Sequence, residues 1–129
     1  MENPPNLVPK RVLLVDDSSG ALMAMALLLK RLDIEIETAG DGEQAVQLLN
    51  EKSFDLLLSD VDMPNMGGFE LLEWASANRP AMPVVLMSGS ASGETGQTAR
   101  RALAKGARGI LSKPFLSGEL ERSVANFLR

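Results

Sequence analysis

Five short apolar segments recur along the chain, and a polar or glycine-containing stretch follows each of them. They are residues 11–15 (RVLLV), 34–37 (IEIE), 56–58 (LLL), 83–87 (PVVLM) and 109–112 (GILS). A short apolar run bounded by polar residues is typical of a strand buried on both faces, as in a parallel sheet covered by helices. The second segment alternates apolar and acidic residues, which indicates a strand nearer the sheet edge. The pattern therefore predicts five strands.

Helical patterns separate these segments. We expect helices from Ser18 or Ser19 to about Arg31, over 43–51, from near Gly68, around 98–105 and over 118–128. This alternation predicts an α/β fold, a doubly wound, five-stranded parallel sheet with right-handed crossovers and helices on both faces. The 129 residues are expected to form one domain, 1–129, in which the proline-containing residues 1–9 form a flexible N-terminal tail.

The first helix carries more apolar residues than one buried face needs. Its core stripe is predicted to be Ala21, Leu22, Met25, Leu28, Leu29 and Leu32, at i, i+3, i+4 spacing. Met23 and Leu27 lie outside that stripe, four residues apart, on the side expected to face solvent. Exposed methionine and leucine together indicate a partner-docking surface. A wider helix-packing face is an equally good interpretation of the pattern.

Composition removes several kinds of chemistry. The chain contains no cysteine and no histidine, so disulfides, thiolate chemistry and the usual neutral-pH base are missing. A net charge of −4 gives no support for a nucleic-acid-binding surface. No apolar run approaches the ~20 residues of a membrane span. We therefore expect a cytoplasmic domain that binds neither nucleic acid nor membrane and that acts through carboxylates, hydroxyls and lysine.

Polar side chains that are able to take part in binding or catalysis stand at the carboxyl ends of four predicted strands. Asp16 and Asp17 follow the first strand, Asp60 the third, Ser88 the fourth and Lys113 the fifth. The carboxyl ends of parallel strands meet at one edge of the sheet, where open α/β folds bind their ligands. Each residue alone has an ordinary interpretation, as a helix cap, a turn or a helix start. Together they predict one polar pocket.

The electrostatics of that pocket call for a cation. Two like charges about 4 Å apart cost roughly 4 kcal/mol at an effective dielectric of 20. Three carboxylates must therefore bind a cation, protonate or separate, and one lysine does not neutralise them. An all-oxygen acidic site suits Mg²⁺. A metal beside Lys113 and Ser88 is equipped to bind a phosphoryl group, and Asp60 is the candidate nucleophile because aspartate forms acyl phosphates.

The chain resembles a response-regulator receiver domain of two-component phosphorelay signalling. The motifs VLLVDDS, LLLSDVDMPNMGG, VVLMSGS and ILSKPF stand in the family's order, at close to its spacing, and cover nearly all of the chain. The resemblance implies the flavodoxin-like strand order 2-1-3-4-5. It also implies a protein that catalyses only its own phosphorylation and dephosphorylation and is otherwise not an enzyme.

The resemblance assigns a role to each candidate residue. Asp17, Asp60 and the backbone carbonyl of Asp62 match the direct Mg²⁺ ligands, and Asp16 matches the acid that binds the metal through water. Asp60 also matches the phosphoacceptor. The hydroxyl that moves onto the phosphoryl group is matched by Ser88, and the lysine that pairs with that group by Lys113. The implied phosphodonors are a histidine kinase, a histidine phosphotransfer protein or a small acyl phosphate, and the downstream partner stays unknown.

Two features concern how such a domain would signal. Many receivers carry an aromatic residue three positions before the lysine, where this chain has Ile110, a β-branched residue that is stiff at χ1. The stretch after Ser88 contains three glycines and is longer than usual for the family. We therefore expect a switch that orders residues 90–98 when Ser88 moves, although a merely tolerant surface loop also fits.

A cis peptide is predicted at Lys113–Pro114, where a sharp turn must aim the lysine into the pocket.

Two rival interpretations remain. Asp60-Val61-Asp62 also resembles the Asp-x-Asp motif of haloacid-dehalogenase-like phosphatases, although there the metal acids follow the motif instead of preceding it. The other rival is a degenerate receiver that serves only as a binding scaffold, and the complete set of acids with Lys113 argues against it. The pathway, the oligomeric state and the presence of further domains are not encoded in these residues.

Overall fold

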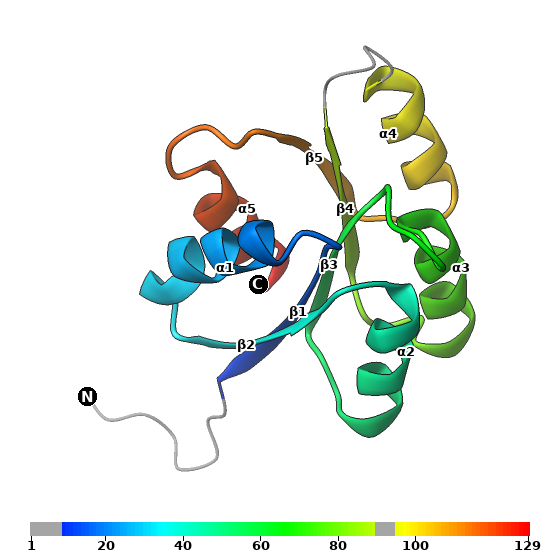
Figure 1. The fold of residues 1–129 in the computed structure, drawn as a ribbon, viewed down its shortest axis with the longest axis horizontal. Helices are drawn as coiled ribbons and strands as arrows, with labels where there is room; N and C mark the ends of the chain where they lie inside the picture. Colours follow the sequence, from blue (N-terminus) through cyan, green and yellow to red (C-terminus); the bar gives the residue numbers. More distant parts are fainter. Residues whose placement is uncertain (1–8, 90–94) are drawn as a thin grey trace.

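The strands and helices alternate along the chain as the apolar pattern predicts (Figure 1). The computed structural model describes residues 9–89 and 95–129. Its elements are β1 (Lys10–Val15), α1 (Ser19–Leu28), η1 (Leu29–Arg31), β2 (Ile34–Ala39), α2 (Gly42–Glu51), β3 (Leu56–Asp60), α3 (Gly68–Asn78), β4 (Val84–Gly89), α4 (Thr95–Ala104), β5 (Gly109–Lys113) and α5 (Glu119–Phe127). The predicted tail lies almost wholly outside the described residues.

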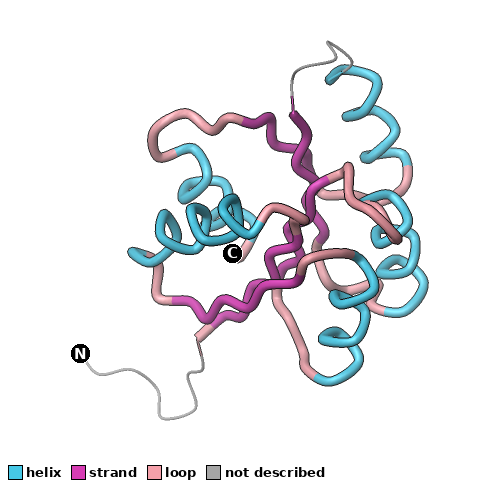
Figure 2. Tube along the Cα trace, in the orientation of Figure 1, coloured by secondary structure: helices cyan, strands magenta, loops and turns pink. Residues whose placement is uncertain are grey.

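The strands form one parallel sheet in the order β2-β1-β3-β4-β5, with β3 at its centre. The α/β class and the 2-1-3-4-5 order are thereby confirmed. Helices α1 and α5 lie on one face of the sheet, and α2, α3 and α4 lie on the other (Figures 1 and 2). Because both faces are covered, the central strands are apolar on both sides, which explains the unbroken run in β3.

Successive side chains of each strand feed two separate cores. In β1, Leu13 and Val15 pack with the α2–α3–α4 side, whereas Val12 and Leu14 pack with the α1–α5 side. All four are fully buried. This division follows from the period of two in a strand, which turns alternate residues to opposite faces. The sheet is therefore held from both sides, and its carboxyl edge is a rigid base for a site.

Three strands extend further toward their carboxyl ends than the apolar runs indicate. Asp60 is the last residue of β3 and pairs in register with Met87 of β4, and Ser88 pairs with Ser112 of β5. Lys113 is the last residue of β5. Polar residues can continue a strand because the ladder bonds use only backbone groups. Asp60, Ser88 and Lys113 are thus held by the sheet itself and not by the loops beyond it.

One predicted core residue of the first helix is wrong. Leu28 is 43% exposed, while its neighbour Leu29 is fully buried. Leu29 follows the buried Met25 by four residues and so lies on the same side of the helix, as predicted, whereas Leu28 lies at the edge of that side. Met23 and Leu27 are 68% and 64% exposed, as the pattern predicts. Over the residues described, no helix has the length and apolarity needed to cross a membrane.

Candidate functional site

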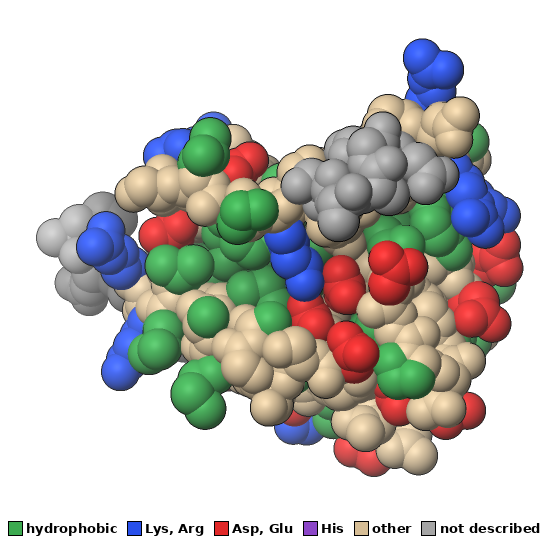
Figure 3. Space-filling view, turned by 45° about the horizontal axis from the view of Figure 1, so that its top comes forward, with side chains coloured by type: hydrophobic (Ala, Val, Ile, Leu, Met, Phe, Trp, Pro, Cys, Tyr) green, Lys and Arg blue, Asp and Glu red, His purple; other side chains and the backbone are tan. Residues whose placement is uncertain are grey.

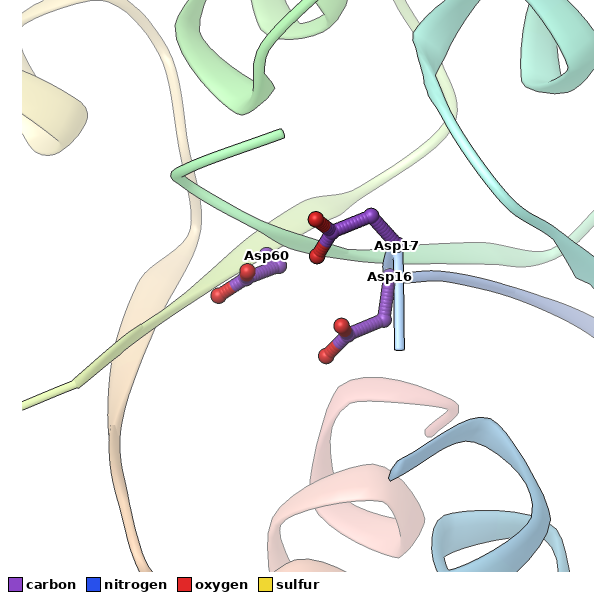
Figure 4. A group of neighbouring side chains, drawn as sticks. All are labelled: Asp16, Asp17 and Asp60. Carbon is purple, nitrogen blue, oxygen red and sulfur yellow. The ribbon is translucent and has the colours of Figure 1, made fainter. Parts of the chain in front are cut away.

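The polar residues predicted to meet at the sheet edge do so. Asp16 and Asp17 directly follow β1, and Asp60 closes β3, the adjacent strand. Figure 4 shows the three carboxyl groups directed into one shared space from two neighbouring strand ends. One carboxylate oxygen from each residue lies within 4.8 Å of those of the other two. The convergence expected from sequence is therefore present.

The three acids differ in burial. Asp16 is only 2% exposed, and the Asp60 side chain is 13% exposed, whereas Asp17 is open to solvent. A buried carboxylate needs hydrogen-bond partners, and Asp16 has one for each oxygen. Its Oδ1 accepts from the Ser18 backbone N–H at 3.0 Å, and its Oδ2 accepts from the Lys113 ammonium at 2.7 Å. Asp16 is thus fixed in place beneath the other two acids.

The first helix is capped by Ser18 and not by either aspartate. The Ser18 side chain accepts the backbone N–H of Ala21 at 3.1 Å, which is the usual N-cap arrangement. Of the segment Asp16-Asp17-Ser18, which alone reads as a helix cap, only Ser18 has that role, and the cap interpretation is wrong for the two aspartates. Both carboxyl groups remain directed to the site.

Lys113 links the fifth strand to the acids. Its Nζ lies 2.7 Å from Asp16 and 3.4 Å from Asp60. Partial burial lowers the pKa of Lys113, but the hydrogen bond to Asp16 and the charges of Asp60 and Asp16 outweigh that effect, so the pKa is raised overall. The ammonium group therefore stays charged.

The peptide between Lys113 and Pro114 is cis, as predicted. Pro114 does not start a helix, since α5 begins at Glu119.

Asp60 differs from an ordinary surface aspartate in its pKa. Burial raises its pKa, and the charges of Asp16 and Asp62 act in the same direction, while Lys113 lowers it. The net pKa is above the usual range for aspartate. Lys113 alone thus leaves the acids under-compensated. Added positive charge at this point would be stabilising.

The donor set fits a hard divalent cation. Three carboxylate oxygens converge without nitrogen or sulfur ligands, as a Mg²⁺ site requires. The Asp62 side chain is exposed and is not part of this group. Asp62 does line, together with Asp17, a surface cavity of about 430 Å³ beside the acids. The backbone carbonyl of Asp62 therefore stays a predicted ligand.

Ser88 lines a second cavity, which shares Asp62 with the first. Ser88 is buried near the end of β4, and its hydroxyl donates a long 3.3 Å bond to the carbonyl of Gly89. The cavity, of about 590 Å³, is also lined by Val61 and by Arg101 of α4. The Arg101 guanidinium lies 4.0 Å from the centre of the Phe69 ring on α3, a cation–π contact between the two helices.

Gly68 is a site residue that the sequence pattern did not single out. Its N–H donates to the carbonyl of Val61 at 2.9 Å. A Cβ atom here would lie 2.9 Å from the Val61 Cα and even closer to the Asp60 carbonyl oxygen. The start of α3 therefore packs directly on the backbone of Asp60, and only glycine permits that approach. The Gly-Gly pair in the sequence signals a turn, but not this contact.

Comparison with known proteins defines the class. The response regulator receiver domain matches residues 12–125, which shows that the chain belongs to this family. A receiver domain is a signalling module and not a catalyst beyond its own phosphorylation chemistry.

Individual relatives agree with that assignment. The chain is 41% identical over 109 residues to the two-component response regulator ORR24 of Oryza sativa subsp. indica, covering 83% of this chain but 17% of that protein. The receiver domain of a putative Luxo repressor protein from Vibrio parahaemolyticus superposes with a TM-score of 0.86 at 28% identity, covering 94% of this chain and 91% of that one. A BeF3-activated DrrB receiver domain superposes with a TM-score of 0.80 at 25% identity, covering 94% of this chain and 98% of that one.

Proposed function

We propose that this domain accepts a phosphoryl group on Asp60 and thereby changes its affinity for a downstream protein. The observation that carries the proposal is the convergence of Asp16, Asp17 and Asp60 within 4.8 Å, with the Lys113 ammonium between Asp16 and Asp60. Family membership supports it, because receiver domains generally receive phosphoryl groups from histidine kinases.

Each residue has a distinct part in the proposed transfer. A carboxylate oxygen of Asp60 attacks the phosphorus atom, and the bond from phosphorus to the donor nitrogen or acyl oxygen breaks. Lys113 offsets charge on the transferred group, and the Ser88 hydroxyl turns from the Gly89 carbonyl to donate to a phosphoryl oxygen. A Mg²⁺ ion held by Asp17, Asp60 and the Asp62 carbonyl, and through water by Asp16, would offset the remaining charge.

The buried position of Asp16 suits an indirect role toward the metal. Its two oxygens already accept from Ser18 and Lys113, so it orients the lysine and adds negative charge beneath the cation. Asp17 is exposed and free to turn toward the ion. The site is thus rigid at its base and open above, as transfer from a large donor requires.

We propose that the donor is a histidine kinase or a histidine phosphotransfer protein that docks on α1. Figure 3 shows acidic side chains gathered beside one basic side chain, with hydrophobic side chains exposed on the α1 side of that cluster. Met23 and Leu27 supply exposed apolar surface on α1, and Ser18 at the start of this helix is hydrogen-bonded to Asp16 of the site. A donor helix packed on α1 would therefore bring its phosphohistidine close to Asp60. Such donors place the domain in the cytoplasm.

We propose that the signal leaves through α4 and the segment between Ser88 and Thr98. The central residues of that segment, 90–94, lie outside the described part of the structure. Ile110 packs against the core on the α2–α3–α4 side of the sheet, and it has no hydroxyl to exchange for a new partner. The cavity between α3 and α4 gives α4 room to move once Ser88 turns. Output through this helix would not need an aromatic ring on β5.

Incubation with acetyl phosphate and Mg²⁺, followed by intact-mass measurement, tests the proposed function. One phosphoryl group should add to the protein with Mg²⁺ and none when a chelator removes it. Asp60→Asn should abolish the addition. Steady turnover of a phosphate ester would favour the phosphatase interpretation instead, and a folded protein that gains no mass would favour a scaffold.

A further inference from the structure

The amino end of α2 is bonded to the loop that follows β3. Asp41, the N-cap of α2, uses its two carboxylate oxygens differently: Oδ1 accepts from the Gln44 backbone N–H at 2.9 Å, and Oδ2 accepts from the Asn65 side-chain amide at 3.2 Å. Next to this bond, the Gly42 N–H donates to the Met66 carbonyl at 3.1 Å. One carboxylate thus joins a helix cap to a loop that lies 24 positions away in sequence.

The two backbones approach as closely as their atoms allow. A Cβ atom on Gly42 would lie 2.7 Å from the Met66 carbonyl oxygen and 2.8 Å from the Met66 Cβ, distances that no real side chain tolerates. Asn65 has a positive φ of 67°, a conformation that asparagine adopts more readily than most residues. Both sides of this contact therefore carry the residue types that its geometry needs.

These bonds complete the anchoring of the loop 61–67. Its first residue, Val61, donates its N–H to Met87 at 2.9 Å, and its last, Gly67, donates to the Glu70 side chain at 3.0 Å. The Asp41–Asn65 and Gly42–Met66 bonds hold the second half of the loop, at residues 65 and 66. Asp62 lies between the anchors, so the position of its backbone carbonyl depends on all of them.

We propose that Asp41 and Asn65 are positioning residues for the divalent-cation site, which they serve by holding the loop 61–67 so that the Asp62 carbonyl faces the ion. Neither residue touches the ion. The inference rests on the proposed function, because it takes the Asp62 carbonyl as a ligand. It adds two residues, on α2 and at the tip of the loop, that the acid cluster itself does not include.

Two variants remove this one bond from opposite sides with little other change. Asn65→Gly deletes the amide but keeps a residue that tolerates a positive φ. Asp41→Ser keeps an effective N-cap for α2 but lacks the second oxygen and the reach to Asn65. Asn78→Gly is the matched control, because within the described part of the chain the Asn78 side chain donates to the Trp74 carbonyl of its own helix, α3, and to no other segment.

Isothermal titration of Mg²⁺ into each folded variant provides the test, with circular dichroism to establish folding. Loss of supporting contacts around a metal site costs roughly 10–100-fold in affinity, and we expect about tenfold weaker binding for each variant and little further loss in the double variant. Asn78→Gly should bind like the wild type. At saturating Mg²⁺, labelling by acetyl phosphate should return close to the wild-type rate.

The outcomes separate the two proposals. Wild-type protein that binds Mg²⁺ and is phosphorylated, with folded Asn65→Gly binding Mg²⁺ within twofold of it, would overturn the positioning role and leave the proposed function intact. Wild-type protein that binds no Mg²⁺ would overturn both. Should Asp41→Ser unfold, Asn65→Gly alone still decides the matter.

Discussion

Lys113 donates a 2.7 Å hydrogen bond to Asp16, a residue 97 positions earlier in the chain. The same ammonium lies farther from Asp60, at 3.4 Å. Its first electrostatic effect is therefore to neutralise the most buried acid of the cluster. Asp60 stays within its reach, which is where a phosphoryl group would need the positive charge. One lysine thus joins the stability of the fold to the chemistry of the site.

Replacing Lys113 with alanine should weaken the fold. Asp16 would keep a buried charge without its charged partner, and we expect the free energy of unfolding to fall by about 1–3 kcal/mol. The loss should be smaller than for a fully buried pair, because the Lys113 side chain is 26% exposed. Urea unfolding with and without Mg²⁺ measures this effect, and Mg²⁺ should stabilise the variant more than it stabilises the wild type.

Lys105→Ala is the control for that experiment. Lys105 pairs with Glu73 at the same 2.7 Å distance, but both side chains are on the surface. Such pairs contribute at most about 1 kcal/mol. Equal effects of the two substitutions, or no response of Lys113→Ala to Mg²⁺, would contradict the role given to Lys113.

Asp60→Asn should stabilise the fold at neutral pH when no divalent cation is present. Burial raises the pKa of Asp60 above its ordinary value of 3.8, so its charged form is less favourable in the folded than in the unfolded chain. The stability that Asp60 contributes is complete below the unfolded pKa and is lost as the pH rises through the folded pKa. Asparagine carries no charge and avoids that loss.

Thermal unfolding across pH measures the difference between the two proteins. The advantage of Asp60→Asn should shrink as the pH falls through the folded-state pKa of Asp60. Excess Mg²⁺ at neutral pH should also reduce it. A variant that is less stable than the wild type at neutral pH, or an advantage that does not vary with pH, would count against the electrostatic account.

Replacing the exposed apolar side chains of α1 with charged ones should slow transfer from a protein donor. Met23→Glu combined with Leu27→Lys removes two exposed apolar side chains, and a loss of roughly 1.4 kcal/mol in docking corresponds to a tenfold lower kcat/KM. Labelling by acetyl phosphate should not change, since it needs no docking surface. The measurement compares transfer from the cognate phosphohistidine protein with labelling by acetyl phosphate.

Leu103→Glu serves as the matched control. Leu103 is also exposed, but it lies on α4, on the opposite face of the sheet from α1. It should leave transfer from the donor unchanged. Equal loss of both reactions in the α1 variant would indicate a folding defect, and full transfer by that variant would remove α1 as the docking surface.

Phosphorylation should change hydrogen exchange after β4. If Ser88 moves onto the phosphoryl group, it pulls the segment that follows toward the site. We therefore expect greater protection from hydrogen exchange across residues 89–98. Exchange is compared between free protein and its complex with beryllofluoride and Mg²⁺, the type of activation named for the similar DrrB receiver domain. Changes confined to Ile110 and its strand would contradict a switch based on this segment.

The fold was largely predictable because its strands are buried on both faces. The runs RVLLV and LLL have no other good interpretation in a chain of alternating elements, and they mark β1 and β3 correctly. The order of strands is a different matter, since alternation is compatible with several orders. That prediction came from the motifs that resemble the receiver family. Boundaries were less accurate, because the sheet continues through Asp60 and Lys113 by backbone bonds alone.

The parts of the site that sequence reasoning missed depend on contacts between distant segments. Gly68 is required because α3 packs on the Asp60 backbone, and the Asp41–Asn65 bond joins residues 24 positions apart. Neither has a local pattern beyond an ordinary turn or cap. The prediction for Leu28 is wrong because apolar periodicity does not show how far around the helix the buried face extends.

The central claim is that the phosphoryl group is carried by the carboxylate of Asp60. Hydroxylamine converts an acyl phosphate into a hydroxamate, so treatment of the labelled protein followed by peptide mass spectrometry identifies the modified residue. We expect the hydroxamate on Asp60 alone, and only when both acetyl phosphate and Mg²⁺ were present. A hydroxamate on Asp16, Asp17 or Asp62, or a phosphoryl group that resists hydroxylamine and maps to Ser88, would contradict the account.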